Sequence, residues 1–263
     1  MRGPAAPPSL PAAVARLLSV CARDEYSLAE LVSTVEGDPG IASRLLRLAN
    51  SAYYGLHRQV GDLERAALVL GRTTVQAVAL GATLLELWRD RPLPARAEDL
   101  WVHAYLCGMG CRHLARRLPS SPWRSEAEAL FLAGLLHDLG KLLFLAREPE
   151  PYLEALEQLA DRPSLRTWER DHFGADHAEA GAEALEAWSL PAHVIEVVRH
   201  HHAGGLRAEL RPDWEVLRAV DDLLIGEPRD EDEEAPPEGL MVDLATHLES
   251  ARAEAQAFYQ AIA

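Results

Sequence analysis

The chain has 263 residues, of which 48% are hydrophobic and 25% are charged, close to the averages for globular proteins. Its formal net charge of −15 argues against nucleic-acid binding, because phosphate backbones attract proteins with an excess of basic residues. The three cysteines have no paired spacing, which indicates free thiols in a reducing compartment rather than a disulfide framework.

The sequence shows no targeting or membrane-spanning segment. No apolar run approaches the roughly 18 residues that cross a bilayer. The start, MRGPAAPPSLP, has no apolar stretch after its single arginine and so differs from a signal peptide. We therefore expect a cytoplasmic protein that does not bind a membrane.

The pattern of apolar residues predicts an all-α fold. Apolar positions recur at helical spacing almost throughout, and the alternating runs that are typical of strands are missing. The signals in the first part of the chain, in order, are an apolar face from Leu10 to Cys21, a Ser27–Glu30 capping box, an Asp38 N-cap before Pro39, a helix start at Asp62 that ends at Gly71, and a helix over Thr74–Trp88.

A short stretch with two prolines and alternating charges, Arg89–Ala97 (RDRPLPARA), separates two helical halves. We interpret the halves as an N-terminal lobe, residues 1–92, and a second lobe, residues 93–263. The helices predicted in the second lobe are 98–118, 125–147 behind a Ser125–Glu128 capping box, one behind an Asp176–Glu179 box, one opened by Pro191, 213–226, and an amphipathic C-terminal helix.

An acidic, proline-rich segment near residues 227–239 (EPRDEDEEAPPEG) interrupts the second lobe. Its charges repel one another, which predicts a solvated loop. The segment is either a docking site for a basic partner or a simple insertion.

Residue types that bind metal ions are concentrated in the second lobe. They are His103, the adjacent pair His137 and Asp138, His177, the run His200–His202, and Asp221. Taken singly, each has a simpler explanation, such as a hydrogen-bonded histidine in the core or a carboxylate on the surface. Taken together, they predict a metal site.

The His137–Asp138 pair carries most of this prediction. His137 follows Leu130 and Gly134 at helical spacing and so faces the core, where a histidine beside an aspartate needs partners for both. The two oxygens of Asp138 could bridge two metal ions while His137 binds one. Mixed imidazole and carboxylate ligands suit iron, manganese, zinc or nickel better than calcium. Two such ions about 3.5–4 Å apart would clamp a phosphoryl group and generate a hydroxide nucleophile.

Lys141 and two cysteines allow two interpretations each. Lys141 lies about one turn after His137, where it either meets a phosphate oxygen or faces solvent at a helix end. Cys107 and Cys111 follow His103 at steps of four residues, so all three share one helical face. A thiolate site is conceivable there, but we favour core packing, which is the commoner role of a free cysteine.

Several motifs resemble the HDOD domains, which are bacterial signalling relatives of the HD metal-dependent phosphohydrolases. The order His…His-Asp…His…His-His…Asp resembles the HD superfamily. The segment 28–55 (LAELVSTVEGDPGIASRLLRLANSAYYG), followed by AALVLG, is similar to the first part of HDOD domains. The segment Glu169–Pro191 and the following VIEVVRHHHA also match, and they align His201 and His202 rather than His200.

The resemblance covers about residues 9–226 and implies an all-α fold in two helical lobes. Family members usually act as regulatory modules in signal transduction, and many have lost metal ligands. This chain keeps a match at every ligand position of active HD proteins, namely His103, His137, Asp138, His177, His201, His202 and Asp221, and it also keeps Lys141. It lacks the Gly-Tyr-Pro motif of the cyclic-di-GMP phosphodiesterase branch and has AGGLRAEL after His202 instead.

Two functions therefore follow from the sequence. The first is an HDOD-type signal-transduction or regulatory module that meets a signalling protein in trans and holds one or two divalent transition-metal ions. The second is a metal-dependent phosphohydrolase that acts on a nucleotide, a cyclic nucleotide or another phosphate-containing small molecule. In the second case, Asp138 and Lys141 are the predicted catalytic residues.

Overall fold

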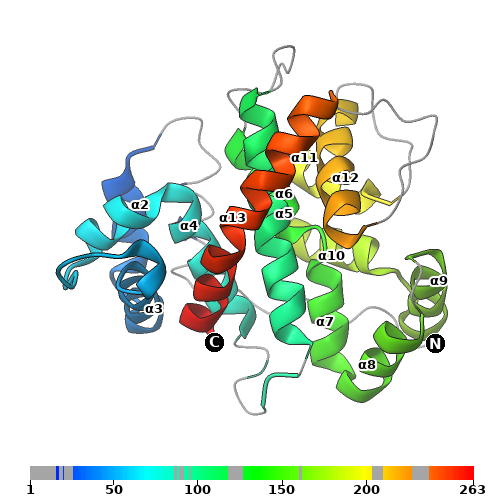
Figure 1. Cartoon of the computed structure of the whole chain (residues 1–263). Coiled ribbons are helices and arrows are strands. Elements are labelled where there is room, and N and C mark those ends of the chain that lie inside the picture. The colour runs from blue at the N-terminus through cyan, green and yellow to red at the C-terminus, as the bar shows by residue number, and fades with distance from the viewer. Residues whose placement is uncertain are drawn as a thin grey trace. The chain divides into compact units, whose positions relative to one another are not determined.

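The computed structural model describes residues 16–17, 20, 26–85, 88, 92–94, 96–117, 127–159, 162–202, 210–226 and 237–263. Over these residues the regular structure is helical and contains no strand, which confirms the predicted all-α fold (Figure 1). Several predicted features lie outside them: most of the Leu10–Cys21 face, Ser125, part of the Arg89–Ala97 connection, residues 203–209 and most of the acidic segment.

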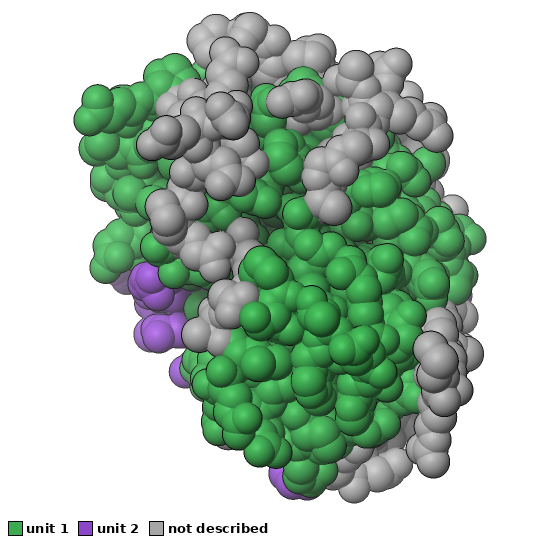
Figure 2. Space-filling model, turned by 90° about the vertical axis from the view of Figure 1, so that its right-hand side faces the viewer, with its two compact units in different colours: residues 1–7, 93–250 green, residues 8–92, 251–263 purple. Residues whose placement is uncertain are grey.

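The chain forms two compact units, which Figure 2 shows in separate colours. Unit 1 holds the described residues between 93 and 250, and unit 2 holds those up to 92 together with 251–263. The C-terminal helix α13 (Glu238–Ile262) has residues in both units, whereas the predicted lobes give all of it to the second. The lobe boundaries stay a prediction.

Unit 2 contains α2 (Leu28–Val35), α3 (Pro39–Ala49), the short 3₁₀ turn η1 (Ala52–Tyr54) and α4 (Leu63–Leu85). Both predicted N-caps are present: Ser27 and Glu30 form a reciprocal capping box, and the Asp38 carboxylate accepts from the backbone N–H of Ile41 at 3.0 Å. Gly71 interrupts α4 with a non-helical backbone at φ 76°, ψ 164°, as its predicted role as a helix stop requires.

Unit 1 begins with α5 (Ala97–Arg117), α6 (Ala127–Leu136) and α7 (Leu139–Arg147). The single helix predicted over 125–147 is wrong, because the chain turns at His137 and Asp138 between α6 and α7. No glycine or proline stands at the turn, and the leucine pattern continues across it, so periodicity alone does not reveal the break.

Among the described residues, five further helices lie wholly in unit 1, two that the sequence did not predict and three that it did. The unpredicted helices are α8 (Pro149–Gln158) and α9 (Arg162–Phe173). The predicted ones are α10 (His177–Ala187), α11 (Ala192–His200) and α12 (Arg211–Ile225). Asp176 and Glu179 form the expected capping box at the start of α10.

The segment Ala127–Arg147 is long and apolar enough to cross a membrane, although we expected no such run. Its most apolar window of 18 residues has a mean hydropathy of 1.7, but 83% of that window is buried inside the protein. A helix that is apolar on every side and buried by its neighbours is the pattern of a core helix. The apolarity of α6 and α7 is therefore explained by their place in the core.

Two glycines allow the backbones of unit 1 to approach closely. A Cβ atom at Gly134 in α6 would lie 2.8 Å from the backbone carbonyl of Cys107 in α5. A Cβ atom at Gly140 in α7 would lie 2.6 Å from Cα of His177 in α10. Only glycine fits such contacts. They bring the turn at His137 and Asp138 next to α5 on one side and to the start of α10 on the other.

Candidate metal centre

All seven predicted metal ligands lie together in unit 1, in two groups. The first group is His103, Cys107, His137 and Asp221, and the second is Asp138, His177, His201 and His202. Within each group, one ligand atom from every residue lies within 4.8 Å of all the others. His200 belongs to neither group, and its ring lies 3.8 Å from Glu196 instead. That these residues bind metal stays a prediction.

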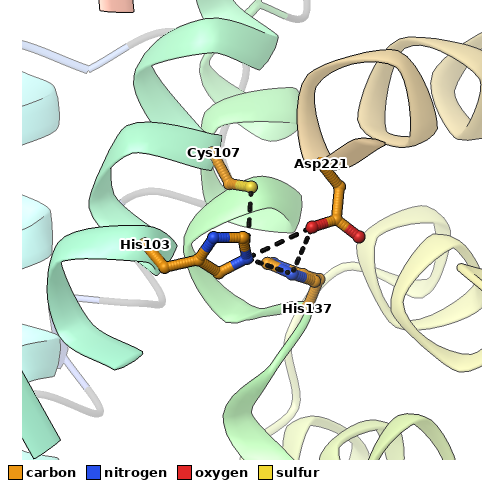
Figure 3. A group of neighbouring side chains, drawn as sticks. All are labelled: His103, Cys107, His137 and Asp221. Carbon is orange, nitrogen blue, oxygen red and sulfur yellow. Dashed lines mark hydrogen bonds and ion pairs between the residues drawn. The ribbon is translucent and has the colours of Figure 1, made fainter. Parts of the chain in front are cut away.

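Figure 3 shows the first group, in which side chains from three places in the chain point toward one another. Nε2 of His103 lies 3.3 Å from Nε2 of His137 and 3.2 Å from Oδ1 of Asp221. Nε2 of His137 lies 3.8 Å from the same Asp221 oxygen. Sγ of Cys107 lies 3.7 Å from Nε2 of His103, so this cysteine is buried in the core, as we expected, and its sulfur also faces the other residues of the group.

The second group gathers around Asp138. Its Oδ1 lies 3.5 Å from Nε2 of His177 and 3.8 Å from Nε2 of His201. Nε2 of His202 lies 2.7 Å from Nε2 of His177. Two imidazoles therefore face one carboxylate oxygen, and the third lies against His177.

Asp138 also joins the two groups. Its second oxygen, Oδ2, lies 3.4 Å from Nε2 of His137 and 3.7 Å from Nε2 of His103. One carboxylate thus presents a different oxygen to each group, which is the arrangement expected of a ligand that bridges two ions.

Two buried atoms in the centre lack hydrogen-bond partners among the described residues. They are Oδ1 of Asp138 and Nε2 of His201. A buried polar atom without a partner costs about 1–3 kcal/mol, so such atoms usually mark a missing water or ion. Both atoms belong to the second group and are of the kinds that bind transition metals.

Hydrogen bonds at Nδ1 orient three of the histidines. Nδ1 of His137 lies 2.7 Å from the carbonyl oxygen of Gly134, and Nδ1 of His201 lies 2.6 Å from that of Val198. Nδ1 of His177 lies 2.6 Å from Oε2 of Glu169. Since carbonyl and carboxylate oxygens only accept, each Nδ1 carries a proton and each ring turns Nε2 toward the centre.

The Glu169 carboxylate is a supporting group that sequence reasoning did not assign to the site. It is fully buried and accepts from the phenol of Tyr152 at 2.6 Å. Glu169 stands at the start of a motif that resembles the family, which is the one signal that could have found it. Tyr152 lies 17 residues earlier on a helix that was not predicted, so no local spacing points to it.

Burial and neighbouring charges shift the pKa values of four residues in the centre. Burial disfavours the charged form of Asp138, but His137 and Lys141 outweigh burial and hold its pKa well below the usual range. Burial would lower the pKa of His137, but Asp138 and Asp221 raise it above its usual value. Burial and neighbouring histidines lower the pKa values of His201 and His202, so both rings stay neutral and able to bind a cation.

Lys141 faces the site rather than solvent. Its Nζ lies 2.7 Å from Oδ2 of Asp138, and its side chain is 17% exposed. Burial would lower its pKa, but Asp138 raises it, so the ammonium keeps its charge. Of the two interpretations of Lys141, the solvent-facing one is wrong, and a contact with a phosphate oxygen stays a prediction.

Known proteins resemble this chain over most of its length. It is 27% identical over 201 residues to an uncharacterised protein of Treponema pallidum (strain Nichols), a match that covers 74% of this chain. The match covers 37% of that protein, so the chain spans little more than a third of the curated relative.

Two solved structures share the fold. A protein of Marinobacter aquaeolei VT8, provisionally named a signal transduction protein, superposes with a TM-score of 0.79 at 21% identity, over 97% of this chain and 59% of its own. A protein of Shewanella amazonensis SB2B, provisionally named a phosphohydrolase, superposes with a TM-score of 0.69 at 22% identity, over 97% and 95%.

The family model of the HDOD domain matches residues 8–204, about three quarters of the chain. The matched span includes the described histidines of both groups, and Asp221 lies beyond its end. The chain therefore belongs to the HDOD domain family, as its motifs predicted.

Proposed function

We propose that this chain is a regulatory module of bacterial signal transduction whose unit 1 holds one or two divalent transition-metal ions. The observation that carries the proposal is the position of Asp138. Its Oδ1 is buried without a hydrogen-bond partner and faces the imidazoles of His177 and His201, while His202 completes the group. A cation bound there would satisfy both orphaned atoms at once.

The donor set fits a transition metal. Five imidazoles and two carboxylates suit iron, manganese, zinc or nickel. His103, His137 and Asp221 would hold one ion, His177, His201 and His202 the other, and Asp138 would bridge them. When bound, such ions would polarise a phosphoryl oxygen and lower the pKa of a bound water. The name of the Marinobacter structure supports a signalling role for the module.

A second candidate function, a metal-dependent phosphohydrolase, is favoured by the partly exposed edge of the site. The side chains of His103 and Lys141 are 19% and 17% exposed, whereas those of Asp138 and Asp221 are 5% exposed. A small anion would therefore approach along this edge. There the Lys141 ammonium would bind a phosphate oxygen, and Asp138 would orient the attacking group. The name of the Shewanella structure is in keeping with this candidate.

The partners follow from the two candidates. A regulatory module would meet a signalling protein in trans, and an enzyme would bind a phosphate-containing small molecule. The acidic balance of the chain opposes nucleic acid as a partner, and we propose a cytoplasmic location in keeping with a buried apolar core.

The test is elemental analysis of protein without a histidine tag, purified and then reconstituted with iron, manganese, nickel or zinc. We expect about one or two ions per chain, lost in a His137→Ala, Asp138→Ala double variant and kept in His200→Ala, which removes a histidine outside both groups. No metal in the wild type under any of these conditions would refute the proposal. A screen of phosphoesters and cyclic nucleotides with the loaded protein then separates the two candidates.

A further inference from the structure

The first group contains one potential ligand that the proposed function leaves unused, the thiol of Cys107. The side chain is fully buried on α5, one turn after His103. Its Sγ lies 3.7 Å from Nε2 of His103 and within 4.8 Å of the ligand atoms of His137 and Asp221. Figure 3 shows the sulfur pointing toward the same centre as the two rings and the carboxylate.

The packing of α5 against α6 fixes this position. Gly134 leaves no side chain between the two helices, so the backbone of Cys107 lies against it, and His137 follows Gly134 by one turn. Cys111 is a useful contrast, because it lies one turn further along α5, is fully buried and belongs to neither group. The two cysteines share a helix face, but only Cys107 reaches the ligands.

The distances suit four ligands around one ion. Metal–nitrogen, metal–oxygen and metal–sulfur bonds of about 2.0–2.3 Å place tetrahedral ligand atoms about 3.3–3.8 Å apart. The separations measured from His103 to His137, Asp221 and Cys107 are 3.3, 3.2 and 3.7 Å. The separation between His137 and Asp221 is 3.8 Å. Four of the six separations in a tetrahedral site are therefore close to this range, and the other two, from Cys107 to His137 and to Asp221, are below 4.8 Å.

Lys141 makes the sulfur the available fourth ligand. Oδ2 of Asp138 lies 2.7 Å from the Lys141 ammonium but 3.4 and 3.7 Å from the rings of His137 and His103. An oxygen already paired with an ammonium is a weaker donor to a cation, so Asp138 would bridge to the first ion only as a weak fifth ligand.

We propose that Cys107 is a metal ligand, which completes a site of two imidazoles, one carboxylate and one thiolate with His103, His137 and Asp221. This proposal rests on the proposed metal binding, and it narrows the choice of metals that the first group would accept. On binding, the thiol gives its proton to solvent and its sulfur forms a bond to the ion. A thiolate is a soft ligand that suits zinc and disfavours manganese, whereas imidazole and carboxylate alone accept both. We therefore expect the first group to favour zinc over manganese.

The test replaces zinc with cobalt(II), whose bond to a thiolate gives a charge-transfer absorption in the near ultraviolet. The sequence contains three cysteines, so a Cys21→Ser, Cys111→Ser variant keeps Cys107 as its single thiol. We expect the band in the wild type and in this variant. We expect Cys107→Ser to lose the band while it still binds cobalt. We also expect its zinc affinity relative to manganese to fall by at least about tenfold, because loss of an outer-shell partner alone lowers metal affinity by about that much.

Each outcome decides the proposal. If the wild type binds cobalt but shows no charge-transfer band, or if the band persists in Cys107→Ser, the thiolate ligand is overturned and the metal site is left intact. No cobalt bound by the wild type overturns the metal site and the thiolate ligand together. If Cys107→Ser does not fold, X-ray absorption of the zinc-loaded Cys21→Ser, Cys111→Ser variant decides instead, because it must contain one sulfur neighbour at about 2.3 Å.

Discussion

Glu169 holds His177 by two hydrogen bonds to one oxygen. Its Oε2 lies 2.9 Å from the backbone nitrogen of His177 and 2.6 Å from Nδ1 of the same residue. The carboxylate therefore fixes both the start of α10 and the direction of the ring. A carboxylate behind a metal-binding histidine sets its tautomer and raises its basicity.

Glu169→Gln is expected to weaken metal binding without unfolding the protein. The amide keeps the size of the side chain but can accept only through one oxygen and carries no charge. Loss of such an outer-shell partner typically lowers metal affinity about 10–100-fold. Competition with a chromophoric chelator measures the affinity, with Glu154→Gln on the exposed face of α8 as control. An affinity equal to that of the control would contradict this role of Glu169.

Lys141→Met is expected to make the protein depend more strongly on metal. Without the ammonium, the buried Asp138 carboxylate loses its 2.7 Å partner, which costs about 1.5–3 kcal/mol in the metal-free protein. A bound cation replaces the lost charge. The rise in melting temperature on adding zinc should therefore be larger in the variant than in the wild type. Equal rises would show that Lys141 and the metal do not share Asp138.

Gly140→Ala is expected to damage both fold and site. The added Cβ would meet the backbone of His177, which cannot move without shifting the start of α10. Overpacking of this kind costs typically about 1–3 kcal/mol, and the displaced His177 should lower metal content as well. Gly239→Ala, where a Cβ meets nothing within 4 Å, is the matched control. Chemical denaturation compares the two, and equal free energies of unfolding would contradict the close approach of α7 and α10.

A histidine stack outside the two groups is expected to make unit 1 less stable in acid. The rings of His247 and His113 stack with centroids 4.0 Å apart, and the Asp243 carboxylate lies 2.7 Å from Nε2 of His113. Burial lowers the pKa of His247, and the charges of His113, Arg112 and Arg117 lower it further, against the opposing effect of Asp243.

The sign of this effect follows from where the proton binds more readily. Because the pKa of His247 is lower in the folded protein, the unfolded chain takes up the proton first, and stability falls as pH drops below about 6.5. His247→Asn removes the titrating group. The free energy of unfolding should therefore fall less in the variant than in the wild type between about pH 7 and pH 5. Denaturant titrations at each pH measure this free energy. An equal fall in the wild type and the variant would rule out a contribution of His247 to the acid sensitivity.

Local signals in the sequence predicted the parts of the fold that local contacts determine. The Ser27–Glu30 and Asp176–Glu179 capping boxes, the Asp38 N-cap and the stop at Gly71 each depend on residues within one turn. The break between α6 and α7 depends on tertiary contacts instead. Asp138 meets His177, and Gly140 lies against the backbone of α10, contacts that no window of the sequence contains.

The same distinction explains the site. Residue type and order were enough to select seven residues that the structure brings together, because the chain matches a known order of histidines and aspartates. The position of Cys107 depends on the absence of a side chain at Gly134, 27 residues later in the sequence, and the support of His177 depends on Tyr152 and Glu169. Helical spacing placed Cys107 on the His103 face but could not say what that face would meet.

The most direct test of the account is the number of metal ions that each group holds. Zinc titration followed by elemental analysis should give about two ions per chain for the wild type. His103→Ala should lose the ion of the first group and His202→Ala that of the second, so each should retain about one, while Asp138→Asn should weaken both. Unchanged metal content in all three variants, or no metal in the wild type, would contradict a two-ion centre joined by Asp138.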